Sequence, residues 1–223
     1  LYVRVAISNE HAEIDLSKKF GALASEALGL LRLCKERGRK VGLSFHVGSQ
    51  CMDKISFLKG IQEIGNIIKK TKIVPDVINI GGGFPSRYKE GIPNFNEICE
   101  EITKALCLHF GSSVPRGIAE PGRYIAGDAG VIEAEVVLVS KKRHGGRRWV
   151  YVDIGKFGGL IETIGEAIRY KVETTRDGGA TGPVVLAGPT CDEMDVLYEL
   201  SGYQLPLDLR EGDKIRILSA GAY

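Results

Sequence analysis

Glu120, Pro121, Gly122 and Arg123 place a carboxylate and a guanidinium close together, directly after the apolar run 117–119. Proline and glycine interrupt a regular strand, so we expect the chain to turn here. A guanidinium binds phosphate oxygens with two parallel hydrogen bonds, and a carboxylate pairs with a protonated nitrogen. These residues are consistent with a ligand that has a phosphate at one end and a cationic ring nitrogen at the other. A structural ion pair at a turn is the alternative.

Two further motifs follow predicted strands in the same way. His46 and Ser49 come at the end of the apolar segment 41–47, and three consecutive glycines follow the segment 77–80. These glycines (Gly81, Gly82 and Gly83) allow backbone N–H groups to approach a phosphate without side-chain clashes. Each motif alone has an ordinary structural explanation. Because parallel strands end on one rim of an α/β barrel, the three motifs together predict a phosphate-bearing ligand there.

The elements expected before Arg123 alternate between strand and helix. We expect strands at about 1–7, 41–47, 77–80 and 117–119, and helices at about 22–37, 54–70 and 95–110. This alternation indicates parallel strands joined by right-handed crossovers. It corresponds to about half of a (β/α)₈ barrel, which has eight such units. A small open, doubly wound sheet is the alternative.

The pattern changes after Arg123. A long alternating segment at 131–142 leads through His144-Gly145-Gly146, read as a hairpin turn, into a returning strand at 148–152. A short helix is expected at about 160–168, with further strands near 170–175, 183–187 and 214–218. Short strands with tight turns predict a second, mostly antiparallel β domain. We therefore divide the chain into a partial barrel (1–126) and a β domain (127–223).

The composition excludes several classes of protein. The 223 residues are 43% hydrophobic and 26% charged, with a formal net charge of +2. The basic residues are scattered, which argues against nucleic-acid binding. The five cysteines form no Cys-x-x-Cys pair, so we predict neither a metal site nor a disulfide framework. With no membrane-length apolar run and no signal peptide in the sequence, we expect a cytoplasmic location.

Four ordered motifs identify a family resemblance across essentially the whole chain. They are Ser44-Phe45-His46-Val47-Gly48-Ser49, Asn79-Ile80-Gly81-Gly82-Gly83-Phe84-Pro85, Glu120-Pro121-Gly122-Arg123-Tyr124 and Gly188-Pro189-Thr190-Cys191-Asp192. Together they resemble the pyridoxal-phosphate-dependent decarboxylases of the alanine-racemase-like fold (fold type III), in the ornithine/lysine decarboxylase branch. The fold that this resemblance implies is a pyridoxal-phosphate-binding (β/α)₈ barrel followed by a mostly antiparallel β domain.

The resemblance also implies roles for the motif residues in binding the cofactor. His46 would stack on the pyridine ring and act as a catalytic residue, and Glu120 would pair with the ring nitrogen. The phosphate would be bound by Ser49, Gly81, Gly82, Gly83, Arg123 and Tyr223. A carboxylate at the ring nitrogen keeps that nitrogen protonated, so the ring can accept the electron pair left by a departing carboxylate.

A second group of residues would act on the substrate. Cys191 matches the catalytic residue that returns a proton after CO₂ leaves, and Asp192 matches the acid that binds the distal amine. Phe157 and Glu166 would also contact the substrate. The family forms head-to-tail homodimers with shared active sites. Lys19 and Asp195 lie where a salt bridge between subunits is expected.

The resemblance implies decarboxylation of L-ornithine to putrescine in polyamine biosynthesis, with L-lysine to cadaverine as a second reaction. The two substrates differ by one methylene, a difference that pockets distinguish by only ~10–200-fold. Diaminopimelate decarboxylase is one alternative, and an inactive binding protein like the antizyme inhibitors is another. In this family the Schiff-base lysine lies in the N-terminal half of the barrel. We expect that half to be absent here, which would leave this chain inactive by itself.

Overall fold

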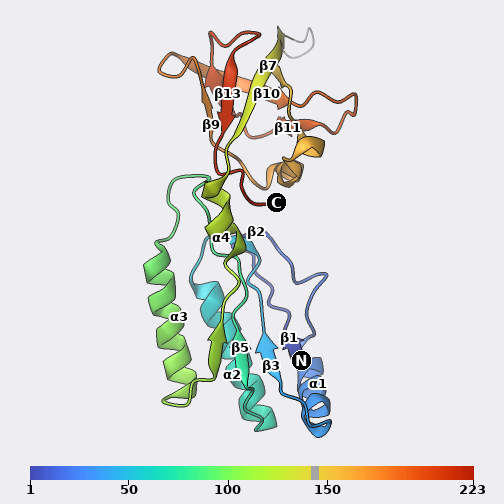
Figure 1. Ribbon diagram of the computed structural model, residues 1–223, viewed down its shortest axis with the longest axis vertical. Coiled ribbons are helices and arrows are strands. Elements are labelled where there is room, and N and C mark those ends of the chain that lie inside the picture. Colours follow the sequence, from blue (N-terminus) through green and yellow to red (C-terminus); the bar gives the residue numbers. More distant parts are fainter. Residues whose placement is uncertain (142–145) are drawn as a thin grey trace. The chain divides into compact units, whose positions relative to one another are not determined.

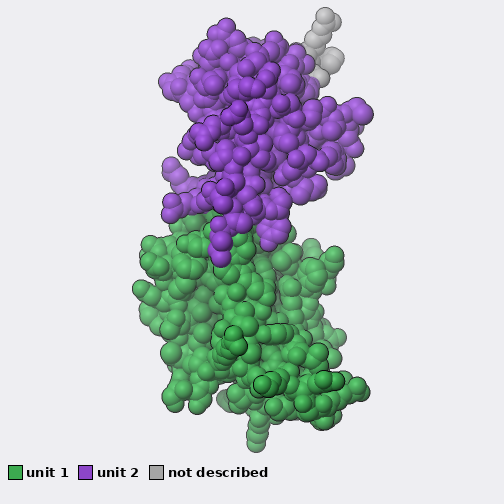
Figure 2. Space-filling model, viewed as in Figure 1, with its two compact units in different colours: residues 1–86, 91–124 green, residues 87–90, 125–223 purple. Residues whose placement is uncertain are grey.

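The computed structural model describes residues 1–141 and 146–223. His144 and Gly145 of the predicted hairpin turn therefore lie outside the described residues. The chain forms two compact units (Figure 2). The first contains residues 1–86 and 91–124, and the second contains residues 87–90 and 125–223. We predicted a division after residue 126; the compact units divide after Tyr124, and the short segment 87–90 belongs to the second unit.

The first unit is built on a four-stranded parallel sheet in the order β1-β3-β5-β6. Its strands are β1 (Tyr2–Arg4), β3 (Gly42–Ser44), β5 (Val77–Asn79) and β6 (Arg116–Ile118). Three helices connect them in turn: α1 (Ala24–Glu36), α2 (Ile55–Thr71) and α3 (Phe95–Phe110). Figure 1 shows these helices alongside the strands. The predicted alternation of parallel strands and helices is present in this order.

Side-chain burial and capping explain the helix positions. In α2, Phe57, Ile61 and Ile64 recur at helical spacing, and all three are completely buried against the sheet. At the start of α3 the Asn94 side chain accepts a hydrogen bond of 2.9 Å from the N–H of Asn96, which caps the first turn. The α3 range is the one predicted from the sequence.

The register of the parallel sheet aligns the ends of its central strands. Ser44 pairs with Asn79, and Asn79 pairs with Ile118, so β3, β5 and β6 end at the same level. The next residues continue this alignment, because Phe45 N donates to Asn79 O and Ile80 N donates to Ile118 O. The segments that follow these three strands therefore begin together on one rim.

A strand ribbon in the first unit and the short helices that follow Pro121 were not predicted. A two-stranded antiparallel ribbon joins β2 (Ala12–Ile14) to β4 (Ser49–Cys51), so Ser49 begins a strand. A short helix, α4 (Gly122–Ala126), starts directly after Pro121, and η1 (Gly127–Ala129) follows it. Proline fixes φ near the helical value, so it is well suited to precede a helix at this turn.

The second unit is built on a seven-stranded sheet. Its strands are β7 (Ile132–Lys141), β8 (Arg148–Val152), β9 (Val172–Thr174), β10 (Thr181–Ala187), β11 (Val196–Tyr198), β12 (Gln204–Pro206) and β13 (Lys214–Ile217). The order is β11-β10-β8-β7-β13-β9, and β12 pairs with β10. The strand pairs are antiparallel except for β8 and β10, which run parallel. The predicted second β domain is therefore mostly antiparallel, with one parallel pair.

The short helix predicted at about 160–168 differs in detail. The structure has two 3₁₀ segments, η2 (Lys156–Gly158) and η3 (Ile161–Glu166). A kink at Ile164 and Gly165 interrupts η3, and Gly165 has a φ of 61°. Glu166 also adopts a left-handed conformation, with a φ of 55°. Such a backbone cannot continue a regular helix, which is why the predicted helix is broken.

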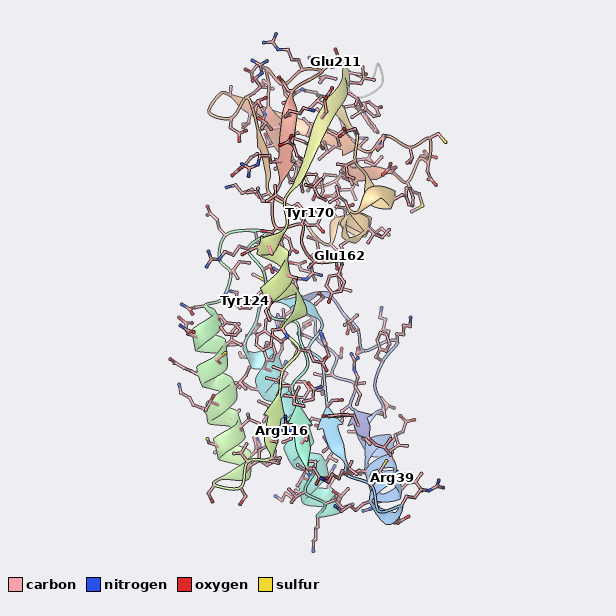
Figure 3. The ribbon with its side chains drawn as sticks, in the orientation of Figure 1. Arg39, Arg116, Tyr124, Glu162, Tyr170 and Glu211 are labelled. Atoms are coloured by element: carbon pink, nitrogen blue, oxygen red, sulfur yellow. The ribbon has the colours of Figure 1, made fainter. Side chains whose placement is uncertain are left out.

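Tyrosines form much of the core of the second unit. The rings of Tyr198 and Tyr203 stack with their centroids 4.5 Å apart. Tyr170, labelled in Figure 3, meets the edge of Tyr88 at 5.3 Å, which connects the segment 87–90 to this unit. The hydroxyl of Tyr203 is used as well, because it donates to Tyr170 O and accepts from Val172 N.

Among the described residues, no helix has the length and apolar character needed to cross a membrane.

Candidate functional site

Arg123 and Ser49 form a polar pair at the rim where the parallel strands end. The guanidinium contacts the Ser49 hydroxyl through Nε at 3.1 Å and Nη2 at 2.9 Å. Only 3% of Arg123 is exposed, and its main-chain oxygen accepts a bond of 2.7 Å from the Ser86 hydroxyl. A buried guanidinium held at both its side chain and its backbone presents a fixed positive charge, as an anion site requires.

Asn79 holds Glu120 in place from the end of β5. Its side-chain Nδ2 donates to Glu120 Oε1 at 2.6 Å, while its Oδ1 accepts from Gly81 N at 2.9 Å. The main chain adds a third link, because Glu120 N donates to Gly81 O at 2.8 Å. One buried amide therefore orients both the Glu120 carboxylate and the first residue of the glycine turn. Asn79 directly precedes Ile80 and the glycine turn in the sequence, but nothing in the sequence reveals this role.

His46 is partly buried, two residues beyond the end of β3. Its Nδ1 accepts a hydrogen bond of 3.0 Å from Gly48 N, so that nitrogen carries no proton and a neutral ring bears its proton on Nε2. Burial lowers the pKa of His46, and the positive charge of Arg4 lowers it further, against a smaller opposing effect of Glu120. At neutral pH the ring is therefore neutral, which suits stacking on another aromatic ring.

The glycine turn fits tightly against these residues. A Cβ on Gly82 would collide with the backbone oxygen of Glu120 and lie 3.1 Å from His46 Nε2. Gly81 and Gly83 have φ values of 69° and 93°, and a Cβ on either would overlap a backbone carbonyl oxygen. Glycine is therefore required at all three positions, because any side chain would displace the rim.

The remaining candidates belong to the second unit. Cys191 and Asp192 are exposed on the loop between β10 and β11. The Asp192 carboxylate accepts from Met194 N at 2.8 Å, which fixes a tight turn directly after it. Phe157 is 57% exposed in η2, and Tyr223 is 76% exposed at the end of the chain. The unit thus exposes a thiol, a carboxylate and two aromatic rings.

Glu166 is used within the chain. Its Oε1 accepts from the N–H groups of Glu199 at 2.7 Å and Leu200 at 2.5 Å, and its Oε2 accepts from Ser201 N at 3.0 Å. Burial acts to raise the pKa of Glu166, but these hydrogen bonds, that from Leu200 first, outweigh it and hold the pKa below its usual range. The carboxylate therefore stabilises the turn after β11, and its contact with a substrate stays a prediction.

The two residues of the predicted salt bridge lie in different environments. Lys19 is exposed in the first unit, with its Nζ 5.3 Å from the centroid of the Phe20 ring. Asp195 is 2% exposed in the second unit, and its carboxylate accepts hydrogen bonds from Lys156 N and from Thr190. The salt bridge between subunits stays a prediction.

Comparison with known families finds one match covering more than half of the chain. The model described as "Pyridoxal-dependent decarboxylase, pyridoxal binding domain" matches residues 1–127. The structure of a mutant of SrLDC in complex with PLP is 29% identical, with a TM-score of 0.81, over 99% of this chain and 56% of that one. The structure of a lysine/ornithine decarboxylase from Vibrio vulnificus complexed with cadaverine has a TM-score of 0.81 and a sequence identity of 32%. The match covers 99% of this chain and 57% of that one.

Curated relatives carry several different names. A lysine/ornithine decarboxylase of Selenomonas ruminantium is 29% identical over 99% of this chain and 56% of its own length. A diaminopimelate decarboxylase of Staphylococcus aureus is 29% identical over 98% of this chain and 52% of its own length. Antizyme inhibitor 2 of Xenopus laevis is 30% identical over 100% of this chain and 52% of its own length. The chain spans about half the length of these relatives, and the likeness confirms the predicted fold class.

The rim of the first unit fits pyridoxal phosphate. The glycine turn leaves room that a Cβ would fill, and the guanidinium of Arg123 and the hydroxyl of Ser49 lie within hydrogen-bond distance of each other. Such donors bind phosphate, and a carboxylate such as that of Glu120 pairs with a protonated pyridine nitrogen. The neutral ring of His46 supplies a flat surface beside them. All of these residues lie within one unit.

Proposed function

The chain belongs to the pyridoxal-dependent decarboxylases, and we propose that the protein removes CO₂ from a basic amino acid. We propose L-ornithine as the preferred substrate, giving putrescine for polyamine biosynthesis, and L-lysine, giving cadaverine, as the second. The observation that supports this most directly is Glu120, held by Asn79 through a hydrogen bond of 2.6 Å at the same rim as Arg123 and Ser49. That rim combines an acid for the ring nitrogen with donors for the phosphate.

In this proposal the rim residues bind and orient the cofactor. Pyridoxal phosphate supplies the electron sink that makes loss of CO₂ feasible. Arg123, Ser49 and the backbone N–H groups of Gly82 and Gly83 bind its phosphate, together with Tyr223, while the N–H of Gly81 is already donated to Asn79. Glu120 keeps a proton on the ring nitrogen, and Asn79 fixes the carboxylate that does so. The neutral ring of His46 packs on the face of the cofactor and adds no further positive charge.

The residues of the second unit act on the substrate. Asp192 offers a fixed negative charge to the distal ammonium group, and Phe157 packs against the aliphatic chain. Cys191 holds a proton at its Sγ and delivers it to the substrate carbon that has lost its carboxylate. Because Glu166 already accepts three hydrogen bonds within the chain, we assign recognition of the amine to Asp192 first.

We further propose a homodimer with shared active sites. Cys191 and Asp192 would serve the cofactor bound by the partner, and Lys19 and Asp195 would form a salt bridge across the interface. Large apolar side chains are exposed on η2, η3 and the nearby loops, as an interface of this kind requires: Phe157, Ile161, Ile164, Met194 and Leu200. All five cysteines are free, which supports a reducing, cytoplasmic location.

Release of CO₂ by the full-length protein with pyridoxal phosphate tests this proposal. L-ornithine, L-lysine and meso-diaminopimelate are offered separately, and kcat/KM is compared. We expect release from ornithine and, more slowly, from lysine. Release from diaminopimelate alone would favour the alternative decarboxylase and contradict the role of Asp192. A protein that binds no cofactor and releases no CO₂ would favour the antizyme-inhibitor alternative.

A replacement of Asp192 tests the choice of substrate. Removal of the charge in Asp192→Asn should raise KM for ornithine by at least ~10-fold, because a charged hydrogen bond contributes about 1.5–3 kcal/mol. The affinity for pyridoxal phosphate alone should not change. An unchanged KM would show that another group recognises the distal amine.

A further inference from the structure

Asp195 is a buried carboxylate that binds two separate loops of the second unit. Its Oδ1 accepts from Lys156 N at 2.8 Å. Its Oδ2 accepts from the N–H of Thr190 at 3.1 Å and from the Thr190 hydroxyl at 2.8 Å. Only 2% of the residue is exposed. The carboxylate thus accepts three hydrogen bonds from within the chain.

The parallel pair of strands explains why these loops meet. β8 and β10 are neighbours, with Tyr151 opposite Ala187 near their ends, so the segments after them leave the sheet side by side. The first segment contains Lys156 and Phe157, and the second runs from Gly188 to Asp195. β11 then begins directly after Asp195 and pairs with β10 in the antiparallel direction.

The backbone of both loops closes around this carboxylate. A Cβ added to Gly155 or to Gly188 would collide with its oxygens, so neither position has room for a side chain. The main chain of Asp195 adds two hydrogen bonds within its own loop. Gly188 N donates to Asp195 O at 2.7 Å, and Asp195 N donates to Asp192 O at 3.0 Å. Asp195 therefore fixes the loop at its start, at Thr190 and at Asp192.

We propose that Asp195 is a positioning residue for the substrate-binding loop. It holds the exposed Cys191 and Asp192 at a fixed place relative to the turn that carries Phe157. This inference deepens the proposed function and rests on it for the roles of these three side chains. It differs from the predicted salt bridge with Lys19, because the contacts lie within one chain.

Matched variants of Thr190 test the proposal with little change in shape. Thr190→Val keeps the backbone N–H but removes the hydroxyl that donates to Asp195, while Thr190→Ser keeps it. Asp195→Asn is the stronger change, because its amide nitrogen faces either the N–H of Lys156 or the donors of Thr190, and the remaining oxygen loses the charge. Lys19→Ala is the comparison for the salt bridge. All variants are made in the full-length protein with pyridoxal phosphate bound.

Two measurements separate positioning from general stability. The rate of Cys191 alkylation by iodoacetamide is followed by peptide mass spectrometry, with the exposed Cys107 as internal reference. The kinetic constants are measured with ornithine at concentrations where sedimentation shows an unchanged assembly. We expect the relative Cys191 rate to change at least ~3-fold in Asp195→Asn and Thr190→Val. We also expect kcat/KM to fall by ~10–100-fold, because small misplacements of reacting groups have effects of this size.

The expected pattern is specific. In Thr190→Ser the relative Cys191 alkylation rate and kcat/KM should both stay at the wild-type values. The affinity for pyridoxal phosphate should stay unchanged in every variant. Wild-type Cys191 alkylation in Asp195→Asn and Thr190→Val would overturn the proposal. It would also be overturned if these variants did no more than weaken the assembly, as Lys19→Ala would. Altered alkylation in a protein that decarboxylates none of the amino acids would refute the proposed function while the positioning role stands.

Discussion

Replacement of Glu166 by glutamine should loosen the turn formed by Glu199, Leu200 and Ser201. Glutamine retains one acceptor oxygen. If it occupies the Oε1 position, the bonds from Glu199 N and Leu200 N remain without the charge, and the amide nitrogen faces Ser201 N. A hydrogen bond to a charged group contributes about 1.5–3 kcal/mol, and a neutral one about 0.5–1.5 kcal/mol. The lost bond removes at least about 1.5 kcal/mol, and each weakened bond loses about 1 kcal/mol or more. Because bonds to one carboxylate are not additive, we expect a total of at least about 3 kcal/mol.

Hydrogen exchange measures this change locally. About 3 kcal/mol corresponds to a roughly 100-fold faster opening, since each 1.4 kcal/mol is tenfold. At pH 7 the protection of the amides 199–201 in Glu166→Gln should therefore fall by about two orders of magnitude. Glu199→Gln is the matched control in the same turn, because its carboxylate is 38% exposed in a 2.6 Å pair with Arg147. An exposed pair contributes about 0–1 kcal/mol, so the control should change little.

The pH dependence provides the stricter test. The pKa of Glu166 in the folded chain lies below its usual value, so the carboxylate stabilises the fold fully above about pH 4.3. This stabilisation is lost as the pH falls through the lower, folded pKa. The difference in protection between wild type and Glu166→Gln should be constant between pH 7 and 5 and should shrink in more acidic solution. Equal protection at pH 7, or a difference that persists unchanged in acid, would refute this reasoning.

Three further substitutions test the rim and the second core. Gly82→Ala should weaken binding of pyridoxal phosphate at least ~10-fold, because the added Cβ would collide with Glu120 and crowd His46. Fluorescence titration measures the affinity, and an unchanged value would contradict the tight packing of the glycine turn. Asn79→Ala should also weaken cofactor binding and shift the pH dependence of the bound cofactor's absorbance, because Glu120 loses the 2.6 Å hydrogen bond from Asn79. Identical spectra would show that Glu120 is positioned without Asn79. Tyr203→Phe should lower the free energy of unfolding in urea by about 1–3 kcal/mol, because Val172 N and Tyr170 O lose the hydroxyl with which they pair. A smaller decrease would indicate that water takes the place of the hydroxyl.

Local patterns in the sequence were sufficient for most elements of the first unit. The apolar spacing in α2 and the Asn94 cap of α3 are signals within a few residues of each other, so the helix positions followed from them. The glycine turn and the Glu120–Arg123 turn interrupt strands, which located the strand ends. Chemistry at those ends then followed from the general property that parallel strands finish on one rim.

Contacts between distant segments were not accessible in this way. The parallel pairing of β8 with β10 joins segments more than thirty residues apart, and nothing in either strand specifies its neighbour. The hydrogen bonds of Glu166 to the turn after β11 have the same character. A glutamate in a short polar segment looks the same in the sequence whether it faces solvent or three N–H groups.

The sequence by itself determined the alternation of parallel strands and helices in the first unit, the residue types at the rim and the family resemblance. The tertiary structure alone decided which polar groups are still available for a ligand. Glu166 and Asp195 are both carboxylates near the predicted substrate-binding residues, and in the folded chain both accept hydrogen bonds from backbone N–H groups. Buried donors and acceptors must be paired, and the partner is set by the path of the backbone in space.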